Sequence, residues 1–162
     1  MIQVGDKLPA GSLQLIKDSK LSSLSIADVF NGKQVAICGV PGAFTPTCSD
    51  THLPGFIALA PALKSAGFDA VICVAVNDCF VMDAWGASVG AAAGDVAMLS
   101  DGGAAWTKAL GLEKDTGDFG GVRMRRVAMA VEDGVVKVLN VEAGAGVSDS
   151  AAEKLLEDWK KL

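Results

Sequence analysis

Apolar residues along the chain gather into short runs that are separated by longer amphipathic stretches. A short apolar run bounded by turn-forming residues is typical of a buried strand, whereas a longer segment with apolar residues on one side predicts a helix. The first two thirds of the chain therefore alternate between the two. Strands are predicted at Gln34–Gly39, Ala70–Val76 and Val96–Leu99, and helices from Thr45 to about Ala66, from Cys79 to about Ala92 and at Ala104–Leu110.

The order of elements changes in the last third of the chain. Two apolar runs, 126–131 and 135–141, are joined by Glu132-Asp133-Gly134, a turn sequence that predicts an antiparallel hairpin. Ser150 and Glu153 have the spacing of a capping box and predict a closing amphipathic helix. This order predicts one α/β domain over residues 1–162, with a mixed central sheet covered by helices on both faces.

Composition narrows the possible environments and partners. The chain has 162 residues, 51% of them hydrophobic, so it is long enough to bury a core without disulfides. No apolar stretch approaches the ~18 residues that span a bilayer, and the first residues lack the pattern of a signal peptide. A net charge of −5 argues against a nucleic-acid partner, because neutralising phosphates requires an excess of basic residues. We expect a cytoplasmic protein, with a mature organellar form left open.

The cysteines define the candidate chemistry. There are four of them and a single histidine, His52. No pair forms a C-x-x-C, so neither a dithiol redox motif nor a zinc knuckle is present, and we expect no metal and no cofactor. Reduced thiols in a cytosol-like compartment are the expectation.

Cys48 has the most informative surroundings. If Thr45 caps the following helix and Pro46 is its first residue, Cys48 lies in the first turn, where free backbone N–H groups and the helix dipole favour an anion. Thiols at such positions, near a basic side chain, ionise more readily than free thiols do. The alternative is a buried, inert cysteine. The polar neighbours of Cys48 and the rigid Pro41-Gly42 and Pro46 favour a nucleophile.

These residues also carry a family resemblance. The spacing P-x-x-x-T-x-x-C, here Pro41, Thr45 and Cys48, resembles the active-site motif of the peroxiredoxins, and PGAFTPTCS followed by HLPGF resembles their type II, peroxiredoxin-5-like subfamily. The resemblance continues through VGDKLPAGSL (4–13), VNDCFVMDAWG (76–86), LSDG (99–102) and RRVAMAVEDGVVK (125–137). It implies a thioredoxin-like fold and a thiol-dependent peroxidase that reduces hydrogen peroxide and alkyl hydroperoxides.

The resemblance also implies residue roles. Cys48 would be the peroxidatic nucleophile that becomes a sulfenic acid, Pro41 would shield it, and Thr45 would hydrogen-bond the peroxide. Arg126 would stabilise the thiolate and the developing charge. Because neighbouring strand residues point to opposite faces, only one of Arg125 and Arg126 can reach Cys48, and the family match selects Arg126. Gly42, Phe44, Thr47 and His52 are expected around the substrate pocket.

Two further features of this segment concern His52 and the Pro54-Gly55 pair. His52 lies one helical turn after Cys48 and could form a Cys–His dyad, but the family uses no histidine base, so we interpret it as a structural hydrogen-bonding residue. Pro54-Gly55 should kink the helix and ease the unwinding that the family shows after oxidation.

The regeneration step also follows from the resemblance. Cys73 matches a possible resolving cysteine, but it falls in the middle of a predicted buried strand. A sulfenic acid at an exposed helix start would instead be captured by glutathione. We therefore expect glutathione with glutaredoxin to be the main reductant, with thioredoxin as the alternative, and the assembly to be a homodimer.

Two other functions compete with a peroxidase. A general thiol–disulfide oxidoreductase is disfavoured because no second cysteine lies within three residues of Cys48. A redox-regulated chaperone or interaction module is the non-enzymatic alternative, and catalytic rather than stoichiometric consumption of peroxide would exclude it.

Overall fold

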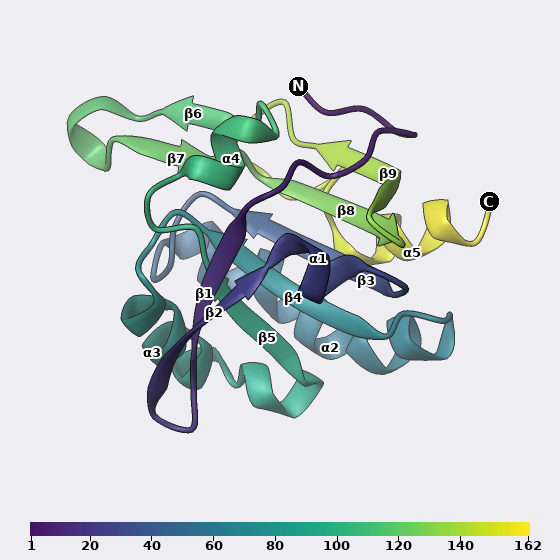
Figure 1. Ribbon diagram of the computed structural model, residues 1–162, viewed down its shortest axis with the longest axis horizontal. Helices are drawn as coiled ribbons and strands as arrows, with labels where there is room; N and C mark the ends of the chain where they lie inside the picture. Colours follow the sequence, from purple (N-terminus) through teal and green to yellow (C-terminus); the bar gives the residue numbers. More distant parts are fainter.

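The central feature of the protein is a seven-stranded mixed sheet in the order β2-β1-β5-β4-β3-β8-β9. The computed structural model describes residues 1–162 (Figure 1). β3, β4 and β5 run parallel to one another, and every other pairing in the sheet is antiparallel. The strands are β1 (Ser12–Lys17), β2 (Lys20–Ser25), β3 (Gln34–Val40), β4 (Ala70–Ala75), β5 (Val96–Ser100), β8 (Val127–Glu132) and β9 (Val135–Val141).

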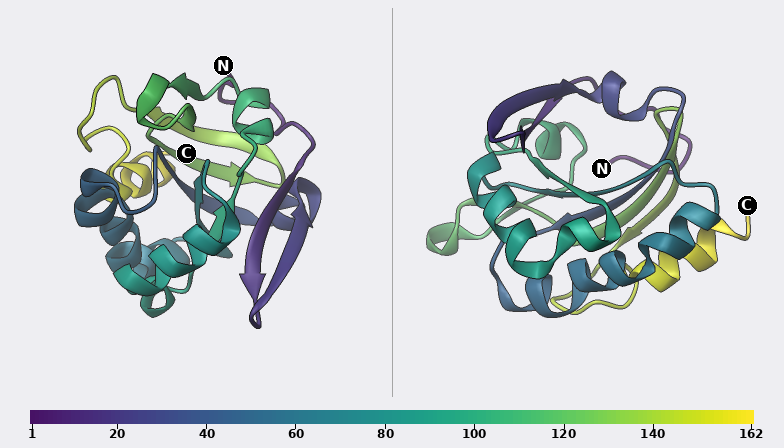
Figure 2. Two further views of the ribbon diagram at one scale, coloured as in Figure 1. Left: turned by 90° about the vertical axis from the view of Figure 1, so that its left-hand side faces the viewer. Right: turned by 90° about the horizontal axis from the view of Figure 1, so that it is seen from below.

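Helices cover both faces of this sheet, which confirms the predicted architecture. α2 (Leu53–Ser65), α3 (Cys79–Val89) and α5 (Ala152–Trp159) pack on one face, whereas the short α1 (Ile26–Phe30) and α4 (Ala105–Ala109) lie on the other (Figure 2). β3 shows why its run is apolar throughout. Ala36, Cys38 and Val40 face the first layer, while Val35 and Ile37 face the second, so both sets of side chains are removed from water.

Five elements were not predicted. β1, β2 and α1 near the N-terminus are short, with six, six and five residues, and only Leu13 in the β1–β2 hairpin is fully buried. A separate two-stranded sheet, β6 (Glu113–Asp115) and β7 (Val122–Met124), forms a hairpin that projects from the body of the molecule (Figure 1). Its strands have three residues each, too few to leave a periodic pattern.

The helix that carries Cys48 is not regular. Pro46 and Thr47 are helical, Cys48–His52 forms a π-helical segment, and α2 follows. The Leu53 N–H donates to the carbonyl of Cys48, one residue further back than in an α-helix. Pro54 next to it has no N–H to donate. The irregularity that we predicted at Pro54-Gly55 therefore lies in the turn before it, around Cys48 itself.

The predicted capping box at Ser150 is wrong. α5 begins at Ala152 after Ala151, and no side chain caps it. The Ser150 hydroxyl donates instead to Glu142 Oε1 at 2.9 Å. The Ser150 hydroxyl, which the local spacing assigned to the helix cap, therefore makes a tertiary contact instead.

None of the helices is both long and apolar enough to cross a membrane. No three or more His, Cys, Asp or Glu side chains are grouped so that they could hold a metal ion. The remaining irregular helices are two 3-10 turns, η2 (Ala91–Gly94) and η3 (Gly117–Phe119).

Candidate active site

Cys48 lies at the start of the π-helical segment and is 1% exposed. The expectation of an exposed sulfur was therefore wrong. The N-terminal turn does begin as predicted, because the carbonyl of Thr45 accepts the first helical hydrogen bond, from Ser49 N–H at 3.0 Å. The sulfur is packed within the apolar layer between the sheet and α2, so any charge on it depends on a specific partner.

Arg126 is that partner. It lies in the short connection between β7 and β8, is 8% exposed, and its Nη2 donates to Cys48 Sγ at 3.4 Å. Arg125 points elsewhere: its Nη2 donates to the Glu142 carbonyl at 3.4 Å and its Nη1 lies 3.8 Å from Met1 Sδ. The register chosen from the sequence is the one in which a guanidinium reaches the sulfur. Neither arginine forms a salt bridge.

His52 holds the arginine from the other side. Its ring is 1% exposed, Nε2 lies 2.9 Å from the Ser150 carbonyl and Nδ1 lies 3.2 Å from Arg126 Nη1. A carbonyl can only accept, so Nε2 carries the proton and Nδ1 accepts from the guanidinium. Burial lowers the pKa of His52 to about 4, and the charge of Arg126 acts in the same direction. His52 is therefore a neutral hydrogen-bonding residue near pH 7 and makes no hydrogen bond with Cys48 Sγ.

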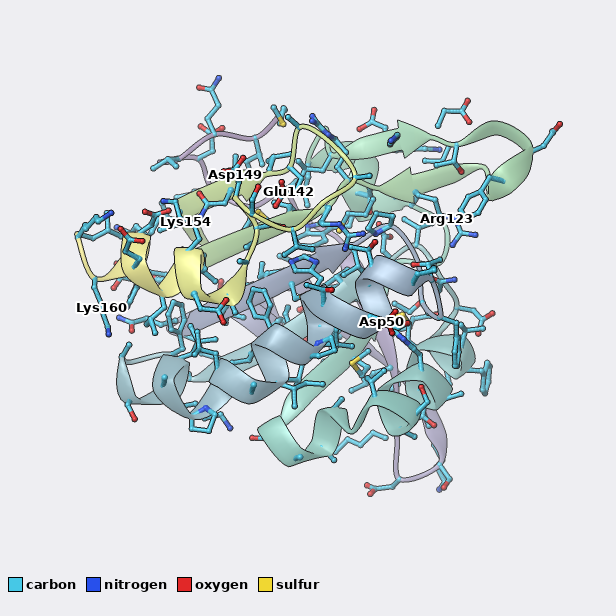
Figure 3. The ribbon with its side chains drawn as sticks, turned by 180° about the vertical axis from the view of Figure 1, so that it is seen from behind. Asp50, Arg123, Glu142, Asp149, Lys154 and Lys160 are labelled. Atoms are coloured by element: carbon cyan, nitrogen blue, oxygen red, sulfur yellow. The ribbon has the colours of Figure 1, made fainter.

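Glu142 extends this network and was not predicted. Its carboxylate, 7% exposed, accepts from the N–H and hydroxyl groups of both Ser148 and Ser150, at 2.6–3.2 Å. Burial alone would raise the pKa of Glu142, but these hydrogen bonds outweigh it and hold the pKa below its usual value. The carboxylate thus fixes the segment that presents the Ser150 carbonyl to His52. In Figure 3 this segment, with Glu142 and Asp149, lies beside the helix start that carries Asp50.

Thr45 and Pro41 belong to the loop that leads into the helix. The Thr45 hydroxyl donates to the Gly42 carbonyl at 2.7 Å, so its proton is committed and its oxygen can accept a hydrogen bond from a bound molecule. Ala43 N–H donates to Asn77 Oδ1 at 3.0 Å, which ties the loop to the end of β4. Phe44 in this loop has a φ of 62°, a left-handed conformation that is costly for a bulky residue.

A cavity of about 370 Å³ opens beside the sulfur. Cys48 itself does not line it, but Arg126, Thr45 and the predicted pocket residue Thr47 do. The other predicted pocket residues differ: Gly42, Phe44 and His52 are not part of the lining, and Phe44 is 58% exposed. The lining comprises Pro41, Thr45, Pro46, Thr47, Lys114, Phe119, Arg125, Arg126, Glu142, Ala143, Gly144 and Ala145.

The other three cysteines are buried and unpaired. Cys38 in β3 is the direct neighbour of Cys73 in β4 and both are 0% exposed. Burial raises the pKa of the Cys38 thiol well above its ordinary value, and a hydrogen bond with Cys73 adds to this. Cys79 begins α3, with 2% exposure. The structure thus places the candidate nucleophile Cys48 and two further buried thiols, Cys38 and Cys73, in one apolar layer.

Similarity to known proteins extends over nearly the whole chain. The profile of the Redoxin family matches residues 3–156. A chloroplastic peroxiredoxin-2E-2 of Oryza sativa subsp. japonica is 49% identical over 161 residues, covering 96% of this chain and 72% of that protein.

Solved structures of peroxiredoxins are also similar to the chain over nearly its whole length. Reduced Prx3 of Vibrio vulnificus in complex with hydrogen peroxide is 46% identical, with a TM-score of 0.94 over 98% of this chain and 99% of that one. Peroxiredoxin 5 of Alvinella pompejana is 33% identical, with a TM-score of 0.87 over 100% of both chains.

Proposed function

The chain belongs to the redoxin family as a type II peroxiredoxin, a thiol-dependent peroxide reductase with an antioxidant role, and on that premise we propose that Cys48 is its peroxidatic cysteine. The observation that carries the proposal is the 3.4 Å hydrogen bond from Arg126 to Cys48 Sγ in an otherwise apolar layer. None of the other cysteines accepts a hydrogen bond from an arginine.

In the proposed reaction the Cys48 thiolate attacks one oxygen of hydrogen peroxide or an alkyl hydroperoxide. A sulfur–oxygen bond forms and the oxygen–oxygen bond breaks, so that Cys48 becomes a sulfenic acid. The second oxygen leaves as water or an alcohol after it takes up a proton. The Arg126 guanidinium stabilises both the thiolate and the leaving oxygen, where negative charge develops.

Thr45 and Pro41 would orient and shield the reacting atoms. Because the Thr45 hydroxyl proton is committed to the Gly42 carbonyl, its oxygen is available to accept the O–H of a bound peroxide. Pro41 and Thr45 both line the cavity next to Arg126, and Pro41 offers water no N–H group there. His52 would act as a positioning residue, through Arg126 and not through the sulfur.

We propose glutathione with glutaredoxin as the main reductant, with Cys73 not required. Cys73 is 0% exposed in the middle of β4, and a Cys48–Cys73 disulfide needs Cα atoms within about 7 Å and relaxed Cβ directions. The 1% exposure of Cys48 means that glutathione capture also requires some opening of the turn. The π-helical geometry supports such opening, because this rare form of helix is frequent at functional sites.

A homodimer that pairs surfaces near the active sites is part of the same proposal. Phe44 and Phe80 are 58% and 65% exposed, and the hydrogen bond between Ala43 and Asn77 brings their segments together. Large exposed aromatic side chains of this kind are typical of protein contacts. Four unpaired cysteines support a reducing compartment such as the cytoplasm.

The nucleophile is tested with Cys48→Ser and Cys79→Ser. Both replace a buried cysteine at the start of a helical segment, but only Cys48 lies beside an arginine. We expect Cys48→Ser to abolish peroxide turnover and Cys79→Ser to keep most of it, with both variants folded by circular dichroism. Turnover by Cys48→Ser above a few per cent of the wild-type rate would overturn the assignment.

The reductant is tested by assaying Cys73→Ser with glutathione and glutaredoxin, and separately with thioredoxin. We expect turnover to persist with glutaredoxin, and mass spectrometry after one equivalent of peroxide to show Cys48 linked to glutathione. A quantitative Cys48–Cys73 disulfide, together with loss of all reductant-supported turnover, would establish a two-cysteine mechanism instead.

A further inference from the structure

The cavity beside Cys48 is unusually rich in unpaired cations for an acidic protein. Lys114 from β6 and Arg125 from the β7–β8 connection line it together with Arg126. The salt bridges of the protein use Lys64, Lys137, Lys154 and Lys161 and none of these three residues. Three cations without a salt bridge in one cavity, on a chain of net charge −5, indicate a negatively charged ligand.

The single carboxylate in the lining does not neutralise them. Glu142 directs its oxygens to Ser148 and Ser150, and Arg125 contacts only its main-chain carbonyl. The lining residues therefore carry two net positive charges. The thiolate of Cys48 cancels one of them before oxidation, and the neutral sulfenic acid does not. The cavity becomes more attractive to anions at the step where the reductant arrives.

Arg126 is committed to Cys48 and His52, whereas Lys114 and Arg125 have no strong partner. The Lys114 side chain is exposed and makes no hydrogen bond, and the contacts of Arg125 are long, at 3.4 and 3.8 Å. Both can therefore bind a new ligand without first losing a salt bridge. An arginine fork is suited to a carboxylate, and a lysine adds a mobile charge.

We propose that Lys114 and Arg125 form a carboxylate clamp that binds glutathione and directs its sulfur toward oxidised Cys48. This rests on the proposed role of glutathione as the reductant. Glutathione carries two carboxylates, and at the clamp its thiolate attacks the sulfenic sulfur. The S–S bond forms, the S–O bond breaks, and the hydroxide leaves as water after taking up one proton. The mixed disulfide is the product that glutaredoxin then reduces.

The clamp is tested with Lys114→Gln/Arg125→Gln and with a matched control, Lys17→Gln/Lys20→Gln. Both double variants change the net charge from −5 to −7. Lys17 and Lys20 are exposed in the β1–β2 hairpin, which lies at the other end of the molecule from β6 and β7 (Figure 1). The readout is the rate at which preformed Cys48 sulfenic acid gains a glutathione adduct, measured by rapid-quench mass spectrometry at low salt.

Glutathione is compared with its diethyl ester and with β-mercaptoethanol, which lack the carboxylates. In the wild type and the Lys17/Lys20 control we expect glutathione to react about tenfold faster than its ester, and in Lys114→Gln/Arg125→Gln about equally fast, since electrostatic steering contributes about tenfold or more. Added salt should reduce the wild-type preference.

Two outcomes would overturn the clamp, and they are distinguishable. If the wild type forms no glutathione adduct, the proposed reductant fails and the clamp fails with it. If the adduct forms but Lys114→Gln/Arg125→Gln keeps the wild-type ratio of glutathione to ester, the reductant stands and the clamp alone fails. An equal loss of rate with glutathione, its ester and β-mercaptoethanol would show a distorted site and would also reject the clamp.

Discussion

Cys48 and Cys38 lie in the same apolar layer, with 1% and 0% exposure, yet their surroundings differ in one respect. Cys38 faces Cys73 on the neighbouring strand, and burial raises the pKa of its thiol. Cys48 receives a hydrogen bond from a guanidinium that is itself held by His52. On the proposed assignment of Cys48 as the nucleophile, the buried cation, and not burial alone, distinguishes its thiol from that of Cys38.

Removing the Arg126 cation tests this difference between Cys48 and Cys38 most strongly. Arg126→Ala should lower the second-order rate constant for peroxide by about 10²–10³-fold, by analogy with the loss of an oxyanion-stabilising donor. Arg126→Lys should recover little of it, because a lysine keeps the charge but loses the planar fork that bonds Cys48 and His52 together. Stopped-flow peroxide kinetics measures both.

Arg125→Ala is the control for register, since Arg125 makes no contact with Cys48. Its effect on the peroxide reaction should be far smaller than that of Arg126→Ala. Damage from Arg125→Ala combined with a neutral Arg126→Ala would show that the wrong arginine has been assigned.

Removing the hydrogen bond between His52 and Arg126, while Arg126 is kept, should give an intermediate loss of peroxide rate. His52→Asn keeps an acceptor near the position of Nδ1, whereas His52→Gln keeps a donor near Nε2. We expect His52→Gln to lose roughly tenfold in peroxide rate, about the worth of one hydrogen bond to a charged group, and His52→Asn to lose less. A merely structural role predicts equal losses in rate that follow the losses in thermal stability.

The buried histidine also predicts a pH dependence of stability. The folded-state pKa of about 4 lies below the ordinary value of 6.5, so the unfolded chain binds more protons between these values. The stabilisation from neutral His52 is present above pH 6.5 and is lost as the pH falls toward 4, on the order of 3 kcal/mol in total. Urea unfolding of wild type and His52→Asn at several pH values should show a shallower slope in the variant. Equal slopes of unfolding free energy against pH in the two proteins would contradict this role of His52.

The smallest effect on the peroxide rate is expected from a substitution of Cys38. Cys38→Ala removes a buried thiol next to Cys73, and we expect the peroxide rate to change by no more than about twofold. The variant should lose about 1 kcal/mol in unfolding free energy, because a small cavity remains in the core. A large loss of peroxide rate in a variant of normal stability would mean that Cys38 takes part in the chemistry.

Features of the fold and of the site that depend on residues close together in the sequence could be predicted, whereas those that depend on distant residues could not. The strand at 34–40 was predictable because both of its faces are buried, and the turn at Cys48 because Thr45 and Pro46 are local signals. The burial of Cys48 could not be predicted, because it depends on residues of other elements that cover the turn. The spacing between Ser150 and Glu153 indicated a helix cap. The Ser150 hydroxyl instead donates to Glu142, the residue that directly follows β9.

The partners of Arg126 show the same limit. The family motif identified the arginine, but its contact with His52 joins residues 74 positions apart, and the one between His52 and Ser150 spans 98. No periodicity records such pairs. An acidic residue followed by two serines in a glycine-rich segment, as in Glu142 to Ser150, is the one local signal that could have suggested a fixed loop.

The measurement that tests the difference between the buried thiols most directly is site-resolved oxidation. The reduced protein is treated with less than one equivalent of hydrogen peroxide in the presence of a sulfenic-acid-specific dione, and each cysteine is quantified by peptide mass spectrometry. We predict that Cys48 carries nearly all of the label in the wild type, that Arg126→Ala loses most of it, and that Cys38, Cys73 and Cys79 stay unlabelled in both. Comparable labelling of Cys38 or Cys73, or labelling of Cys48 that is unchanged in Arg126→Ala, would contradict the role given to the buried cation.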